Sequence, residues 1–142
     1  MDMIWMFAYD KHYDLYDVLR HVPDDGLEFT EWLERTLNAL DTPRSLVVSR
    51  SHLERTYAYH IIAGRRQPSR DKFIQLAVGM GLDIETTSEL LERAGFAGLR
   101  PYKKRDAALA YGIARKMSVP QIDEMLFLAG IEPLRAGYPD FA

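Results

Sequence analysis

Residues 53–68 read LERTYAYHIIAGRRQP and contain the pattern from which the fold can be argued. The segment 54–63 is predicted to be a short helix. Gly64 is expected to end it, because glycine readily takes the left-handed conformation found just beyond helix C-termini. Arg65 and Arg66 follow this stop directly. The stretch therefore predicts a helix that leads into a loop carrying two cations.

The segments before this stretch also show helical spacing. Residues 10–22 place apolar and aromatic side chains at three- and four-residue steps, which indicates an amphipathic helix. Thr30 is predicted to cap the next helix. Asp41 or Thr42 is expected to cap a short helix that ends near Ser51, where the register of the apolar residues changes.

The segments after it continue in the same way. Ser69 and Asp83 are predicted N-caps of two more helices, which Gly81 and Gly95 end. Two further helices are expected over residues 102–116 and 119–129. Because no strand–turn–strand pattern occurs, the chain is predicted to be all-α.

An internal repeat appears at an offset of 35 residues. Residues 70–100 align without gaps on residues 105–135, and each unit reads as a helical hairpin with a glycine stop and a returning leucine. The identical pairs are Arg70/Arg105, Asp71/Asp106, Glu89/Glu124, Leu91/Leu126, Ala94/Ala129, Gly95/Gly130, Leu99/Leu134 and Arg100/Arg135. A free-standing array needs about three such units, so we expect these two to pack on the N-terminal half.

The charge of the chain is unevenly distributed. The net charge is −3, but residues 1–41 hold 3 Lys/Arg against 10 Asp/Glu, and residues 42–72 hold 7 against 2. Residues 73–142 are nearly balanced, with 8 against 9. Positive charge is therefore concentrated around the predicted helix at 54–63, as phosphate binding requires.

Several classes of function find no support in the sequence. There is no cysteine, so disulfides and thiolate metal sites are excluded, as is typical of a cytoplasmic protein. Phosphate-binding glycine loops, His-Glu-x-x-His helices and Gly-x-Ser-x-Gly turns are absent, and the four histidines lack ligand spacing. We expect neither enzymatic activity nor a metal or other cofactor.

The apolar start, MDMIWMFAY (residues 1–9), is too short to span a membrane and lacks the basic beginning of a signal peptide. We expect it to be a strand or arm that packs on the domain or on a second copy of the chain.

Residues 42–72 have the outline of a helix-turn-helix followed by a basic loop. This segment resembles the XRE family, the repressors of the phage lambda and Cro type, over residues of about 29–95. In that family an apolar turn residue is followed eleven positions later by glycine, two basic residues, any residue and proline. The matching residues here are Leu53, Gly64, Arg65, Arg66, Gln67 and Pro68.

The resemblance implies a fold and a division of the chain. The fold is a lambda-repressor-like helix-turn-helix bundle with a C-terminal helical-hairpin extension. Residues 1–28 would be an arm with a possible helix, and residues 29–95 the DNA-binding domain. Residues 96–142 would be the extension that repeats the hairpin at 70–100.

The resemblance also implies DNA-contacting residues. The first residues of the recognition helix, and one a turn further on, would face base edges: Glu54, Arg55, Thr56 and His60. Arg55 is the best candidate for reading guanine, while Glu54 could accept from cytosine. The expected phosphate contacts are Arg44, Arg65, Arg66 and Arg70.

Four positions depart from the family pattern. His52 stands where the turn usually holds glycine, and a non-glycine residue with positive φ is uncommon. Val48 stands where the family usually has alanine, and Ala58 where it has isoleucine, which suggests a compensating exchange of size in the core. Ile62 replaces a frequent glutamate.

A second cationic group, RPYKKRD, occupies residues 100–106. Lysine and arginine in the first turn of a helix are unfavourable because the helix dipole is positive there. An anion is therefore expected nearby, either DNA phosphate or the acidic N-terminal segment.

These observations predict a cytoplasmic, sequence-specific regulator of transcription that binds double-stranded DNA as a homodimer. The alternative is a non-enzymatic adaptor that kept a helix-turn-helix scaffold and binds a protein partner. An antitoxin-like regulator would combine both activities.

Overall fold

The computed structural model describes residues 12, 14–16 and 26–139. Within these residues every regular element is helical, which confirms the prediction of an all-α protein. The arm at 1–9 and the helix at 10–22 fall outside the described residues, apart from 12 and 14–16. The helices of the range 26–139 are α3 (Phe29–Asn38), α4 (Arg44–Ser51), α5 (Arg55–Ile62), α6 (Arg70–Met80), α7 (Ile84–Arg93), α8 (Lys104–Ala114) and α9 (Val119–Leu128).

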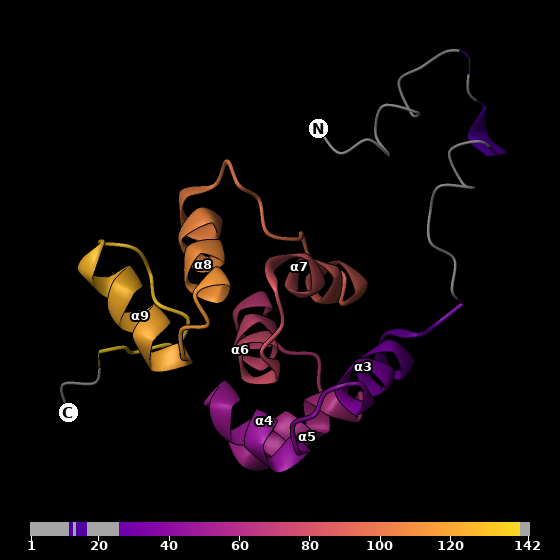
Figure 1. Ribbon diagram of the computed structural model, residues 1–142, viewed down its shortest axis with the longest axis horizontal. Coiled ribbons are helices and arrows are strands. Elements are labelled where there is room, and N and C mark those ends of the chain that lie inside the picture. The colour runs from indigo at the N-terminus through magenta and orange to yellow at the C-terminus, as the bar shows by residue number, and fades with distance from the viewer. Residues whose placement is uncertain (1–11, 13, 17–25, 140–142) are drawn as a thin grey trace.

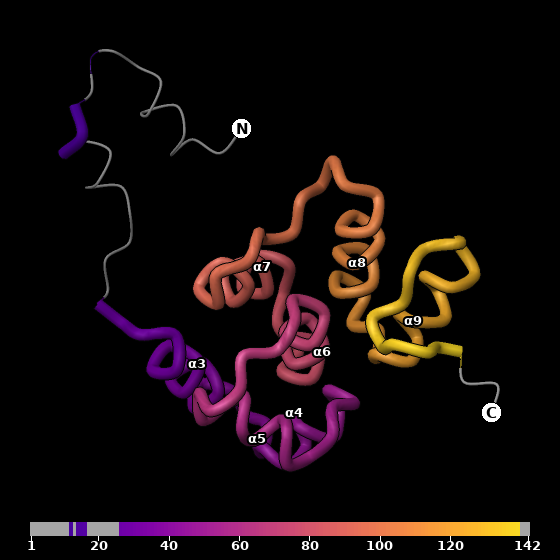
Figure 2. The backbone as a smooth tube through the Cα atoms, turned by 180° about the vertical axis from the view of Figure 1, so that it is seen from behind, coloured from indigo at the N-terminus to yellow at the C-terminus, as the bar shows by residue number. Residues whose placement is uncertain are grey.

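Helix α6 lies at the centre of the molecule (Figures 1 and 2). Helices α3, α4 and α5 lie on one side of it, α7 lies beside it, and α8 and α9 lie on the opposite side from α3. Six of its eleven residues are apolar and buried: Phe73, Ile74, Leu76, Ala77, Gly79 and Met80. The central position follows from this composition, because a helix that is apolar on most of its surface must be covered on most sides.

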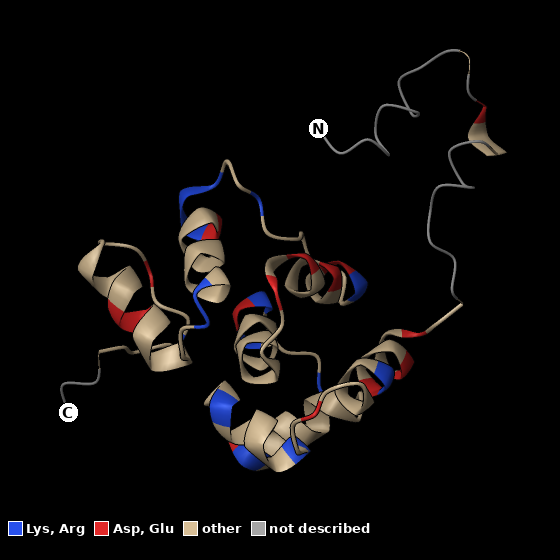
Figure 3. Ribbon diagram, viewed as in Figure 1, with Lys and Arg blue, Asp and Glu red and all other residues tan. Residues whose placement is uncertain are grey.

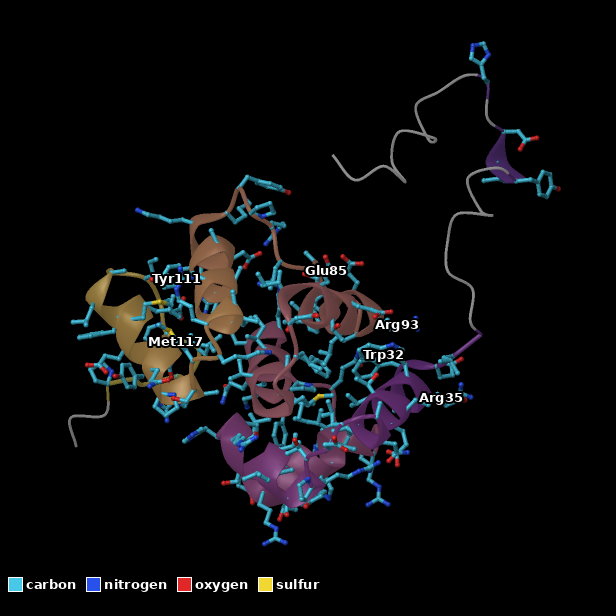
Figure 4. All side chains as sticks on the ribbon, viewed as in Figure 1. Trp32, Arg35, Glu85, Arg93, Tyr111 and Met117 are labelled. Atoms are coloured by element: carbon cyan, nitrogen blue, oxygen red, sulfur yellow. The ribbon has the colours of Figure 1, made fainter. Side chains whose placement is uncertain are left out.

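One continuous core joins both halves of the described chain. It runs from Leu33 of α3 through Ala58 of α5 and Ile74 of α6 to Leu109 of α8 and Leu126 of α9. Aromatic and cationic side chains tie its edge together. The guanidinium of Arg93 lies 5.3 Å from the ring centre of Trp32, which connects α7 to α3 (Figure 4).

The N-caps predicted for the later helices are confirmed. The backbone N–H of Lys72 donates to the Ser69 hydroxyl, and that of Thr86 donates to the Asp83 carboxylate. Ser118 and Gln121 form a capping box at the start of α9. These caps were predictable because each depends on contacts within four residues of sequence.

The N-caps predicted for the earlier helices were wrong. Helix α3 starts one residue before Thr30, so the N-cap position is Glu28, without a side-chain cap. Thr30 instead lies in the first turn, where its methyl group approaches Gly64: a Cβ atom on Gly64 would lie 2.6 Å from it. Pro43 holds the N-cap position of α4, in place of Asp41 or Thr42.

The hairpins α6–α7 and α8–α9 make equivalent hydrogen bonds at the offset of 35 residues. Arg70 donates to the carbonyl oxygens of residues 97 and 98, and Arg105 donates to those of residues 132 and 133. The returning Leu99 N–H donates to Ser88, and Leu134 N–H donates to Asp123. The sequence repeat is thus matched by a repeat of contacts.

Two ion pairs cross between these hairpins in a reciprocal way. Arg70 donates two hydrogen bonds of 2.9 Å to Asp106, and Arg105 donates two of 2.8 and 3.1 Å to Asp71. The starts of α6 and α8 are therefore joined by bidentate contacts in both directions, each made by an Arg-Asp dipeptide. Four of the N–H groups of Arg70 are bonded within the protein, so the predicted phosphate contact would have to compete with these bonds.

Candidate nucleic-acid interface

The turn between α4 and α5 is closed by His52, whose backbone is left-handed with φ 56° and ψ 23°. Beside it, Ser51 is buried and bridges the turn: its hydroxyl donates to the carbonyl of Val48 and accepts from the N–H of Leu53. His52 thus takes the positive φ that is uncommon for a residue other than glycine. A histidine here holds a conformation that glycine would adopt without steric cost.

Replacement of His52 by glycine is therefore expected to raise the free energy of unfolding by up to about 1 kcal/mol. Urea denaturation followed by far-UV circular dichroism measures this change. Ser49→Gly is the matched control, because Ser49 is exposed inside α4 and a glycine there should lower stability by about 0.5–1 kcal/mol. Equal losses in both variants would contradict the assignment of strain to His52.

The buried side of α5 holds the helix against the rest of the fold. Ala58, Ile61 and Ile62 are buried, and Ala58 is fully covered. Val48 of α4 is also in the core. Both residues of the expected size exchange, the larger Val48 and the smaller Ala58, are therefore buried. Ile62 takes part in this core, which accounts for an apolar residue at that position.

The opposite side of α5 carries Arg55, Thr56, Tyr59, His60 and Ala63. Arg55, Thr56 and Ala63 are exposed, and Tyr59 and His60 are partly exposed. Together they line a shallow hollow, which Arg65 also borders. The structure thus brings together three of the predicted base-reading residues, and we call this surface the α5 face.

Tyr59 is a member of the α5 face that the sequence reasoning did not include. Its ring lies with its centre 6.0 Å from the guanidinium carbon of Arg55. The sequence signal was available, because residues four apart lie on the same side of a helix and Tyr59 follows Arg55 by four. A tyrosine there presents both a flat ring and a hydroxyl group beside the arginine.

Glu54 does not line the hollow of the α5 face, and its contact with a base stays a prediction. Its carboxylate is the N-cap of α5 and accepts hydrogen bonds from the N–H groups of Tyr57 at 2.7 Å and Thr56 at 3.0 Å. These bonds lower the pKa of Glu54, with the bond from Tyr57 as the largest cause. The carboxylate is directed at the start of its own helix, where a negative charge is favourable.

Arg44 borders the same hollow but is already paired. It donates to Glu34 at 2.7 and 3.0 Å and to the side-chain oxygen of Asn38 at 2.8 Å. The hydrogen bond from Arg44 lowers the pKa of Glu34, so this carboxylate stays ionised and compensates the guanidinium. A phosphate contact by Arg44 would have to compete with this pair.

Arg65 and Arg66 are exposed in the loop after α5, as predicted. Neither forms an ion pair with any residue in the described part of the chain. Arg65 borders the α5 face, whereas Arg66 lines a neighbouring depression with Phe29 and Thr30. Positive charge is concentrated along α4 and α5 in Figure 3.

The second cationic group lies at the opposite edge of the molecule from α4 and α5 (Figure 3). The anions that offset it are built into the fold. Arg105 is paired with Asp71, and Arg100 is bonded to Asp106. Lys103 and Lys104 remain exposed. The two carboxylates come from the hairpins and offset the two arginines of the group, whereas neither lysine is paired with a carboxylate of the described residues.

Comparison with protein-family models, with curated proteins and with solved structures gave no match for this chain. The described residues contain no group of histidine and carboxylate side chains that could hold a metal ion. None of the described helices is long and apolar enough to cross a membrane.

Proposed function

We propose that the protein is a cytoplasmic, XRE-like regulator that binds double-stranded DNA with α5 in the major groove. The observation that carries this proposal is the composition of the α5 face. Its five residues are cationic, neutral polar or small. Of the two nearby carboxylates, Glu54 is engaged in the cap of α5, and Glu34, which also borders the hollow, is paired with Arg44. An α-helix with such a face fits the major groove and is not repelled by the phosphates beside it.

The residues divide into two roles. Arg55 can donate two hydrogen bonds to the acceptors of guanine, and Thr56 and His60 lie on the same face to contact neighbouring bases. Arg65 and Arg66 have no intramolecular anion among the described residues, so they are suited to phosphate. Tyr59 joins this set as a contact to a base or to the sugar–phosphate backbone.

The proposed regulator acts as a homodimer, because one recognition helix reads too few base pairs for useful specificity. Exposed apolar side chains on α9 support a surface for association. Leu128 is 76% exposed and Phe127 is 45% exposed, at the end of the molecule away from α3. Two α5 faces would then meet two half-sites related by the symmetry of the dimer.

Arg66→Ala is expected to weaken binding of all duplexes alike and to reduce the salt dependence by one phosphate contact. Fluorescence anisotropy on labelled genomic duplexes at several salt concentrations measures both quantities. Lys104→Ala is the control, because Lys104 is also exposed but lies at the opposite edge. An Arg66→Ala protein with the salt slope and affinity of the Lys104→Ala protein would contradict this assignment.

The same exposed side chains on α9 favour the alternative, an adaptor for a protein partner. In that case a specific partner would co-purify with the full chain and would still do so after Arg55→Ala and Arg65→Ala. A regulator that uses only DNA would bind its duplex more weakly in these variants and would have no such partner.

A further inference from the structure

A cavity lies between the α4–α5 turn, the end of α6 and the loop between α8 and α9, apart from the α5 face. Its volume is about 330 Å³, at the lower end of the range for small-molecule sites. Apolar side chains form much of its lining: Val78, Leu82, Ile113 and Met117 (Met117 is labelled in Figure 4).

The polar side of the cavity is cationic. Arg50, His52 and Lys116 border it, and none of its lining residues is acidic. Lys116 donates one hydrogen bond of 2.9 Å, to the carbonyl oxygen of Gly81. Because a lysine has three N–H donors, two are left for a ligand. The nearby carboxylate of Asp83 accepts the N–H of Thr86 at the start of α7, and this bond, with a smaller contribution from Lys116, lowers the pKa of Asp83.

The backbone supplies a second, independent observation. Two non-glycine residues in the described part of the chain have positive φ, His52 at 56° and Lys116 at 55°, and both border this cavity. In the first hairpin, the position equivalent to Lys116 is Gly81, which takes the same conformation without a side chain. The left-handed backbone costs on the order of 1 kcal/mol at each residue. Strained residues of this kind cluster at sites where proteins bind ligands.

We propose that this cavity binds a small organic carboxylate with an unbranched or aromatic apolar body. The carboxylate would contact Lys116, with Arg50 and His52 at the same rim, and the apolar body would lie against Val78 and Ile113. This site does not rest on DNA binding by α5. Because His52 closes the α4–α5 turn, a ligand there would contact the segment that positions α5.

The test uses the full chain and two probes of equal length, octanoate and octan-1-ol. Isothermal titration calorimetry is expected to show saturable binding of one octanoate per chain, at least about tenfold tighter than octanol. No saturable binding of octanoate, or equal binding of the two probes, would overturn the proposal.

Two variants separate the side chains from the fold. Lys116→Gly and His52→Gly each remove a polar side chain from the rim while relieving the backbone, so both are expected to unfold at or above the wild-type temperature. Lys116→Gly should weaken the binding of octanoate at least about tenfold and leave the binding of octanol unchanged. Lys104→Ala, which removes an exposed lysine elsewhere, should bind octanoate as the wild type does. Unchanged octanoate affinity in a folded Lys116→Gly protein would overturn the proposal.

Discussion

Asp106→Ala is expected to lower the free energy of unfolding by about 3–5 kcal/mol, because it leaves Arg70 without its carboxylate in a largely buried position. Asp106 is 3% exposed and accepts from the side chains of Arg70 and Arg100 and from the Arg100 N–H. Denaturation by urea at pH 7, followed by circular dichroism, measures the loss. A weaker helical circular dichroism signal of Asp106→Ala in the absence of urea would show that the start of α8 is unfolded as well.

The internal repeat provides a matched control. Asp71 occupies the equivalent position in the first hairpin and pairs with Arg105, but its side chain is 32% exposed, against 4% for Asp106. Solvent screens that pair, so Asp71→Ala is expected to cost about 1 kcal/mol or less. Equal losses in the two variants would contradict the view that burial decides the strength of these reciprocal pairs.

The same carboxylate predicts how stability depends on pH. Burial raises the pKa of Asp106, but the hydrogen bonds from Arg70 and from the Arg100 N–H outweigh it, so the pKa lies below its ordinary value of 3.8. A group with a lowered pKa in the folded state stabilises the fold above its unfolded value and loses this contribution as the pH falls through the folded value. The difference in stability between wild type and Asp106→Asn should therefore shrink below about pH 4.

Gly79→Ala is expected to lower the free energy of unfolding by about 2–3 kcal/mol, even though alanine is the better helix former by about 1 kcal/mol. A Cβ atom on Gly79 would lie 2.5 Å from the carbonyl oxygen of Val47 and 2.8 Å from the N–H nitrogen of Ser51. Both are backbone atoms of α4, so α4 and α6 must separate. The hydrogen bond from Gln75 to the carbonyl of Ser51 would be strained by the same movement.

Gly98→Ala is the control for this substitution. A Cβ atom there would approach an oxygen of Glu92 at 2.6 Å, but that atom is the end of an exposed, flexible side chain that can move away. The expected change is within about 1 kcal/mol. Thermal or urea denaturation of both proteins compares them directly, and a Gly79→Ala protein as stable as Gly98→Ala would contradict the close approach of α4 and α6.

Local features of this fold were predictable because their causes lie within a few residues. Ser69 and Asp83 cap helices by bonding to N–H groups three residues on, and Gly64 ends a helix through its own backbone. The N-cap predicted at Thr30 was wrong because of a tertiary contact. Thr30 has the chemistry of a cap, but its methyl group packs beside Gly64, more than thirty residues away.

The candidate site was predictable in part for the same reason. Arg55, Thr56 and His60 share a face because helical spacing puts them there, and the spacing would have added Tyr59. The N-cap role of Glu54 was missed because a cap and a base contact require the same position and the same acceptor. The pairing of Arg70 was missed because its partner, Asp106, lies 36 residues further along the chain.

The cavity near His52 could not be predicted from the sequence. It is formed by three segments that are far apart in the chain, near residues 50, 80 and 116. Only the unusual residue in the turn was visible, as a histidine where glycine was expected. Its meaning depends on the second strained residue, Lys116, which tertiary packing brings to the same cavity.

The most direct test of the central claim is base preference at single positions. A duplex enriched by the wild-type protein from a random pool would be varied one base pair at a time, and its affinities for wild type and Arg55→Ala compared. DNA reading by α5 predicts that Arg55→Ala loses about 1–3 kcal/mol of discrimination at one guanine and keeps the preferences elsewhere. No duplex bound by the wild type at low salt, or identical preferences in both proteins, would contradict it.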